Sequence, residues 1–271
     1  MVHGFLGNLA VWHLKIIPAL YNEFRITTYD LRGHGFSDVT ADGYSSGSLA
    51  EDLRGLLDNL DIPQVALVGH SFGADVCLHF ALRYPERVSK MVVIEPGLAA
   101  AMQQRKGAEW KGWAYWVSKL EQAGLQVPDD KRTDLRFLLD LSLQTPRFYG
   151  PLKGLPRNRE PLLHLLHATN LINDSLEVGD LTLEALRCIR TKTLLIYGDQ
   201  SPFLDSYEML RDALPNRTAV LMADGDHFPL LERPEPLRER ILDFLRESNL
   251  ELGQEESLRG ASVGAAGQQD F

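Results

Sequence analysis

The chain has 271 residues, of which 44% are hydrophobic and 24% charged, a composition typical of a soluble globular protein. Its formal net charge of −9, with no basic patch, argues against a protein that binds the phosphate backbone of nucleic acids. We find neither a signal peptide nor an apolar run of membrane-spanning length. Two cysteines without CxxC or metal-ligand spacing fit a reducing compartment, so we expect a cytoplasmic protein without a metal or cofactor.

The first sixty residues predict two helices and a strand. A helix is expected from Asn8 to Leu20, with Asn8 as its cap. The alternating, β-branched segment Phe24–Asp30 predicts a strand. The tetrapeptide Ser48–Glu51 has the residue pattern of a capping box, which predicts a helix over residues 49–60.

The next stretch is the most informative in the chain. The apolar run Val65–Val68 predicts a buried strand, and residues 74–84 predict a helix packed on a sheet. Between them, Gly69–Gly73 reads Gly-His-Ser-Phe-Gly, which in this strand–turn–helix context indicates a nucleophile elbow. We expect Ser71 to sit in a strained turn with an exposed hydroxyl, and the two glycines to avoid Cβ collisions across the bend.

The remainder of the chain continues an alternation of strands and helices, with one interruption. A strand over Met91–Ile94 ends at Glu95, and from about residue 98 to 188 helix formers, tryptophans and prolines replace the alternation. We interpret this interruption as a helical lid. The alternation then resumes with strands over Thr193–Tyr197 and Arg217–Met222 and with helices from about Ser206 and from Pro234 to about Glu247.

This order predicts an α/β protein with a mostly parallel sheet covered by helices on both faces. The expected core comprises residues 1–97 and 189–248, the lid residues 98–188, and a disordered polar tail residues 249–271.

Four segments together resemble the α/β-hydrolase superfamily, over residues 3 to about 247. They are His3-Gly-Phe5, Asp30-Leu-Arg-Gly-His-Gly-Phe-Ser-Asp38, the elbow, and Asp224-Gly-Asp-His-Phe228, in the order that the family shows. The resemblance implies a doubly wound sheet of the hydrolase type and a serine nucleophile. It does not define the substrate, because this fold hosts many reactions.

A serine hydroxyl needs a base to accept its proton during attack. His227 is the best candidate, because it follows the last strand on a tight turn and the family order is serine, acid, histidine. Two N–H donors must stabilise the tetrahedral oxyanion. The residue after the nucleophile, Phe72, supplies one, and by resemblance Phe5 supplies the other.

The acid of the triad is where this chain departs from the family pattern. The usual acid follows the fourth predicted strand, and Ser201 stands at that position. Asp199 and Asp205 lie nearby, and a family alternative one strand earlier points to Glu95. We favour Glu95, because it ends a strand at the sheet edge where family sites lie and because the following proline biases it to extended backbone.

The function expected from these residues is hydrolysis of a carboxylic ester or thioester of a small to medium, largely apolar molecule through an acyl-serine intermediate. Carbon–carbon bond hydrolases and cofactor-free lyases share the Ser/His geometry and stay open as alternatives, as does a ligand receptor that binds without turnover. The natural substrate and the oligomeric state are left undefined by the sequence.

The start of the chain carries a further expectation. Met1 and Val2 stand where the fold has a strand of roughly five residues, between the Phe24–Asp30 strand and the elbow strand. Unpaired backbone groups facing a gap there would cost ~1–3 kcal/mol each if buried. We therefore expect a truncated reading of a longer protein, without its first hairpin and most of its third strand, and poorly soluble on its own.

Overall fold

A computed structural model describes residues 1–104, 110–145 and 158–247 of the chain. The tail over residues 249–271, and the predicted lid residues Phe148 and Tyr149, lie outside the described residues. Within the described part, the sheet has four parallel strands, in the spatial order β1-β2-β3-β4. These are β1 (Val65–His70), β2 (Val88–Ile94), β3 (Thr193–Gly198) and β4 (Arg217–Met222).

The amino terminus extends the sheet beyond β1. Val2 forms a parallel bridge to Gly69, donating its N–H to Val68 O at 2.8 Å. The amino group of Met1 donates to Thr27 O at 2.7 Å, which places the Phe24–Asp30 segment on the far side of Met1. The prediction of a strand there is nevertheless wrong, because a strand needs repeated ladder hydrogen bonds and no strand is assigned among these described residues.

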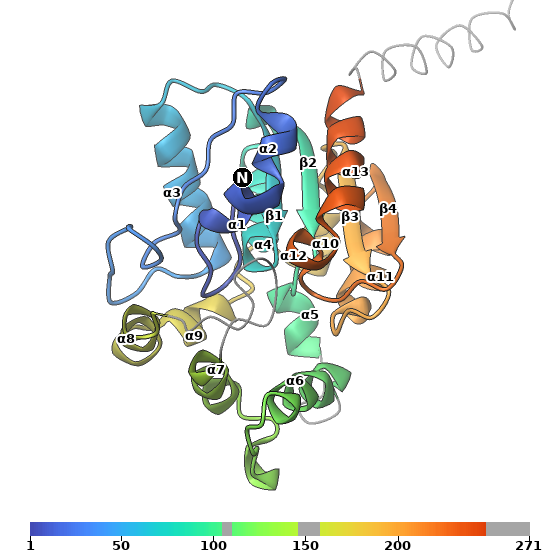
Figure 1. Cartoon of the computed structure of the whole chain (residues 1–271). Helices are drawn as coiled ribbons and strands as arrows, with labels where there is room; N and C mark the ends of the chain where they lie inside the picture. Colours follow the sequence, from blue (N-terminus) through green and yellow to red (C-terminus); the bar gives the residue numbers. More distant parts are fainter. Residues whose placement is uncertain (105–109, 146–157, 248–271) are drawn as a thin grey trace, which may run out of the picture.

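Helices cover both faces of the sheet, as predicted (Figure 1). Side chains of β2 alternate between two apolar clusters: Met91 and Val93 pack in one, and Val92 and Ile94 in the other. The first cluster includes α3 (Ser46–Asn59), α4 (Phe72–Arg83), α10 (Leu183–Leu186) and α11 (Leu204–Ala213). The second includes α1 (Ala10–Lys15), α2 (Ile17–Leu20), α12 (Pro229–Glu232) and α13 (Pro234–Arg246).

Helix α3 begins one turn earlier than the sequence predicted. Ser45 is its cap and accepts the N–H of Ser48 at 3.2 Å, so the capping box assigned to Ser48–Glu51 is wrong. Glu51 has other partners, since its carboxylate accepts hydrogen bonds from Arg83 of α4 at 3.1 Å and from Tyr84, the residue after α4, at 2.7 Å. Ser45 offers the same type of oxygen one turn earlier, and the contact with α4 holds Glu51 away from the helix end.

The described part of residues 98–175 is largely helical and lies beyond the carboxyl ends of the strands (Figure 1), whereas α10, inside the predicted lid range 98–188, packs in the first cluster on the sheet. Two further apolar clusters, made mostly of leucines, join the helices between residues 111 and 175 to one another, and Tyr44 of the core belongs to one of them. The elements that precede α10 are α5 (Ala99–Gln104), α6 (Lys111–Gln122), a 3-10 turn (Asp129–Lys131), α7 (Leu135–Gln144), α8 (Glu160–Ala168) and α9 (Leu171–Ser175).

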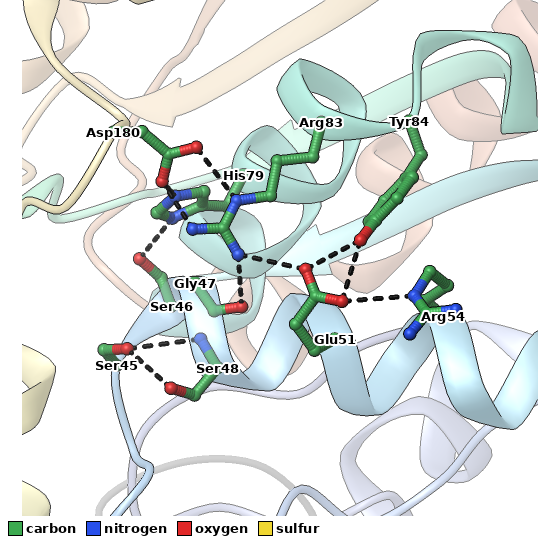
Figure 2. A network of polar contacts seen from close by, with 10 residues as sticks. All are labelled: Ser45, Ser46, Gly47, Ser48, Glu51, Arg54, His79, Arg83, Tyr84 and Asp180. Atoms are coloured by element: carbon green, nitrogen blue, oxygen red, sulfur yellow. Dashed lines mark hydrogen bonds and ion pairs between the residues drawn. The ribbon is translucent and has the colours of Figure 1, made fainter.

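A polar network ties the end of this helical segment to α3 and α4 (Figure 2). Asp180, just before α10, accepts hydrogen bonds from Arg83 at 2.5 Å and from His79 Nε2 at 2.6 Å. The Ser46 hydroxyl lies 2.9 Å from Nδ1 of the same imidazole. Burial, and then the positive charge of Arg83, lower the pKa of His79, while the hydrogen bonds from Arg83 hold the pKa of Asp180 well below its usual range. The network therefore joins a neutral histidine to an ionised aspartate.

Candidate active site

Ser71 occupies the sharp turn between β1 and α4. Its φ of 52° and ψ of −129° are strained for a residue with a Cβ, and its N–H donates to Ile94 O at 2.8 Å, which ties the turn to β2. A Cβ at Gly69 would lie 2.5 Å from Gly73 O, and one at Gly73 would lie 2.4 Å from His3 O. The predicted collision across the bend is thus confirmed for Gly69, whereas a Cβ at Gly73 would collide with the amino-terminal segment instead.

His227 follows β4 and points its imidazole at the serine. Its Nε2 lies 3.0 Å from Ser71 Oγ, and the ring packs against Phe203 and Phe228 at centroid distances of 4.8 and 4.9 Å. Burial lowers the pKa of His227 to about 4, against a smaller opposing effect of Asp226. The imidazole is therefore neutral near pH 7 and able to accept a proton from the hydroxyl.

Glu95 lies on the other side of the imidazole. Its Oε2 is 3.3 Å from His227 Nδ1, and its side chain is fully buried. The Ser201 hydroxyl donates to Oε2 at 2.5 Å, and the Gly198 N–H donates to Oε1 at 2.5 Å. Burial raises the pKa of Glu95 to about 8, although the two hydrogen bonds favour the ionised form.

The backbone of Glu95 differs from the expectation. Its φ is 57°, in the left-handed region, so the extended conformation inferred from the following Pro96 is wrong. Hydrogen bonds from other elements hold this turn, including one from Tyr197 to Pro96 O at 2.6 Å. Tertiary contacts therefore outweigh the local preference that a proline imposes on the residue before it.

The two rival carboxylates lie in other environments. Asp199 is exposed to solvent, and its N–H donates to Met222 O at 3.0 Å. Asp205 is half-buried and accepts the N–H of Ser206 at 2.9 Å. The structure thus brings Glu95 to His227, and it brings Ser201, at the usual acid position, to the carboxylate of Glu95.

The two residues expected to supply N–H donors flank the serine. Phe72 begins α4 directly after Ser71, and its ring meets the ring of Phe5 edge-to-face at 5.8 Å. The turn before Phe5 passes close to Ser71, since a Cβ at Gly4 would lie 2.9 Å from Ser71 Cβ. His3 fixes this turn, because its Nε2 accepts the N–H of Leu31 at 3.0 Å.

One part of the site could not be found from the sequence. Asp226, next to His227 and almost fully buried, accepts hydrogen bonds from Tyr115 at 2.7 Å and Lys119 at 3.2 Å. These two residues lie one turn apart on α6, more than 100 residues earlier in the chain. Their spacing of four residues indicates that both side chains lie on one face of a helix. No local pattern in the sequence links that face to the Asp224–Phe228 segment.

Aromatic rings continue from His227 into the helical segment. Phe203 packs against His227. The ring centroid of Trp110 lies 5.3 Å from that of Phe203, and the ring centroid of Trp113 lies 5.0 Å from that of Trp110. Trp110 also donates its indole N–H to Pro202 O at 3.1 Å, which fixes the ring at the start of α6. A row of aromatic rings, Phe203, Trp110 and Trp113, therefore leads away from His227, and we call this row the aromatic wall.

Within residues 1–104, 110–145 and 158–247, no group of three or more histidine, cysteine, aspartate or glutamate side chains is arranged to hold a metal ion. In the same part of the chain, no helix combines the length and the apolar character needed to cross a bilayer.

A parallel sheet with a serine at the turn after one strand and a histidine after the last defines the class of α/β hydrolases. A family model of the alpha/beta hydrolase fold matches residues 1–234, so the chain belongs to this family.

Relatives support the same assignment without giving a substrate. An uncharacterized protein of Mycobacterium tuberculosis is 35% identical over 97 residues, which are 36% of this chain and span 28% of that relative's length. The uncharacterized hydrolase YugF of Bacillus subtilis is 27% identical over 263 residues, 90% of this chain and 88% of its own. The crystal structure of Cfl2 from Burkholderia cenocepacia is similar with a TM-score of 0.66 and 25% identity, covering 90% of this chain and 86% of that one.

Proposed function

We propose that this hydrolase cleaves a carboxylic ester or thioester of a small to medium, largely apolar molecule through an acyl-serine intermediate. The observation that carries the proposal is the line of three side chains, with Ser71 Oγ at 3.0 Å from His227 Nε2 and Glu95 Oε2 at 3.3 Å from His227 Nδ1. This is the order of nucleophile, base and orienting acid.

In the proposed reaction, Ser71 Oγ attacks the carbonyl carbon while its proton passes to His227 Nε2. The N–H groups of Phe5 and Phe72 stabilise the oxyanion, and the loss of one such donor typically costs ~10²–10³ in rate. The bond to the leaving oxygen or sulfur then breaks, and the imidazolium returns its proton to that atom. Water, activated by His227, releases the acid and restores the serine.

Glu95 has two tasks in this proposal. Its contact at Nδ1 selects the imidazole tautomer that leaves Nε2 free to accept the serine proton. Its carboxylate then stabilises the imidazolium formed during attack. The hydrogen bonds from Ser201 and Gly198 support this second task, because they favour the ionised carboxylate against burial.

The aromatic wall supports an apolar substrate. Phe203 offers ring surface next to His227, Trp110 lies beyond Phe203, and α6 carries Trp113 further along the same wall. Binding sites for small molecules are commonly lined by apolar and aromatic side chains with few polar groups. We propose that α5 to α9 act as a lid that supplies this surface.

Two measurements test the proposal. A fluorophosphonate is expected to form a covalent adduct that mass spectrometry places on Ser71, and p-nitrophenyl acyl esters of graded chain length are expected to give a burst followed by turnover. The Ser71→Ala variant should lose both. The proposal would be contradicted, and a receptor favoured, if the protein turned over none of these esters, formed no adduct and retained an apolar ligand tightly.

A further inference from the structure

The turn that carries Glu95 is strained at both ends. Glu95 has a φ of 57° and Leu98, three residues later, has a φ of 55°. This left-handed region is unfavourable for residues with a Cβ, and such residues persist only where surrounding contacts hold them. The turn is buried at Glu95, Pro96 and Leu98, so these contacts come from the protein interior.

Three buried side chains bind the backbone of this turn. Tyr197 on β3 donates to Pro96 O at 2.6 Å, and Ser206 on α11 donates to Gly97 O at 2.8 Å. The Asp75 carboxylate on α4 accepts the N–H of Leu98, at 3.2 Å from Oδ1. Tyr197 and Ser206 are fully buried, and Asp75 is 5% exposed. Three elements thus converge on one turn.

The contact that this turn must maintain is sensitive to small movements. Glu95 Oε2 is already 3.3 Å from His227 Nδ1, near the limit of a hydrogen bond. If Glu95 relaxed to an ordinary negative φ, its Cβ would leave the backbone in another direction and the carboxylate would turn from the imidazole. Hydrogen bonds that hold this turn therefore affect the direction of the Glu95 carboxylate as well as local stability.

We propose that Tyr197, Ser206 and Asp75 are positioning residues that hold the turn at residues 95–98 in its left-handed conformation and so aim Glu95 at His227. This inference rests on the proposed function, in which Glu95 is the triad acid. The three residues act through the turn and bind backbone groups of residues 96–98. They lie on separate elements, so no local sequence pattern connects them.

Tyr197→Phe removes only the hydroxyl and is the first test. We expect kcat to fall about tenfold with KM unchanged, the loss that corresponds to one hydrogen bond that matters in the transition state. Tyr44→Phe is the matched control, because Tyr44 is also fully buried and its hydroxyl donates to a backbone carbonyl, Thr40 O, at 2.7 Å. Both variants lose a hydrogen bond to a backbone carbonyl, and Tyr44→Phe also loses the one that its hydroxyl accepts from Thr40 N–H at 3.0 Å, yet only Tyr197→Phe should lose turnover.

The aspartate offers a conservative rescue. Asp75→Asn keeps a side-chain oxygen that accepts the Leu98 N–H and should retain most of kcat, whereas Asp75→Ala should lose about tenfold. If both variants lose the same fraction of kcat, the hydrogen bond to Leu98 does not position Glu95.

A second readout does not depend on turnover. The NMR chemical shift of the proton on His227 Nδ1 in the resting protein should change in Tyr197→Phe and stay the same in Tyr44→Phe. The inference is overturned if this resonance is the same in both variants, or if Tyr197→Phe lowers kcat no more than Tyr44→Phe does. If the wild-type protein hydrolyses no ester and forms no adduct, the proposed function fails while the resonance still decides whether the turn is held by Tyr197.

Discussion

The Ser201 hydroxyl donates a 2.5 Å hydrogen bond to Oε2 of Glu95. The residue at the usual acid position of the family thus binds the carboxylate that we propose in its place. The chain thus has a polar side chain after each of the two strands, with the carboxyl group after β2 and a hydroxyl donor after β3. The proposed site therefore depends on the ionisation and orientation of one deeply buried carboxyl group.

The identity of the acid gives the first prediction. Glu95→Gln should leave the fold intact and lower kcat by ~10⁴, because the amide favours the wrong tautomer of His227. Asp199→Asn is the control and should stay near wild type, since Asp199 is exposed. Steady-state kinetics with circular dichroism checks both, and a collapse of the rate in Asp199→Asn alone would show that the acid is misassigned.

Ser201→Ala should change the pH dependence of the reaction. The hydroxyl lowers the pKa of Glu95, so its removal raises that pKa further. We expect the acidic limb of the profile of kcat/KM against pH to move to higher pH, because more alkaline solution is needed to ionise the carboxyl group. Ser201→Thr, which keeps a hydroxyl, should hold the limb in place. A limb that is unmoved or displaced to lower pH in Ser201→Ala contradicts this role.

The raised pKa of Glu95 also predicts how stability varies with pH. Between its ordinary value of 4.5 and about 8, the folded protein retains a proton that the unfolded chain has lost, so wild-type stability falls as pH rises. Glu95→Gln has no such proton, and its free energy of unfolding should rise relative to wild type by up to about 1.4 kcal/mol per pH unit. Urea unfolding of both proteins at pH 5 and pH 8 measures this difference, which should be near zero if burial does not perturb Glu95.

One glycine of the elbow and one inside α3 predict opposite effects for the same substitution. Gly73→Ala places a Cβ 2.4 Å from the carbonyl oxygens of Val2 and His3, and it should destabilise the protein by ~1–3 kcal/mol and abolish labelling of Ser71. Gly55→Ala, inside α3 with nothing within 4 Å of the added carbon, should stabilise it by ~0.5–1 kcal/mol. Thermal unfolding compares them, and equal effects would mean that the elbow adapts to a methyl group.

The sequence was sufficient for the parts of the site that depend on chain order and tight turns. The glycines around Ser71 and the position of His227 after β4 follow from local pattern, and so does the candidacy of Glu95 at the end of β2. The left-handed backbone of Glu95 does not, because the hydrogen bond from Tyr197 that holds it comes from a strand about 100 residues later. The wrong prediction of a strand at Phe24–Asp30 has a similar cause, because strand propensity describes one segment and does not specify a neighbouring strand that it pairs with.

The contact of Asp226 with α6 has a consequence for how this protein can change. Tyr115 and Lys119 bind a carboxylate whose neighbour in the chain is His227, so the helix that we propose to contact substrate is physically coupled to the proposed base. A mutation that reshapes α6 to admit a bulkier molecule also disturbs the base. New specificities should therefore evolve more readily through Trp110 or Trp113 than through the face of α6 that carries these two residues.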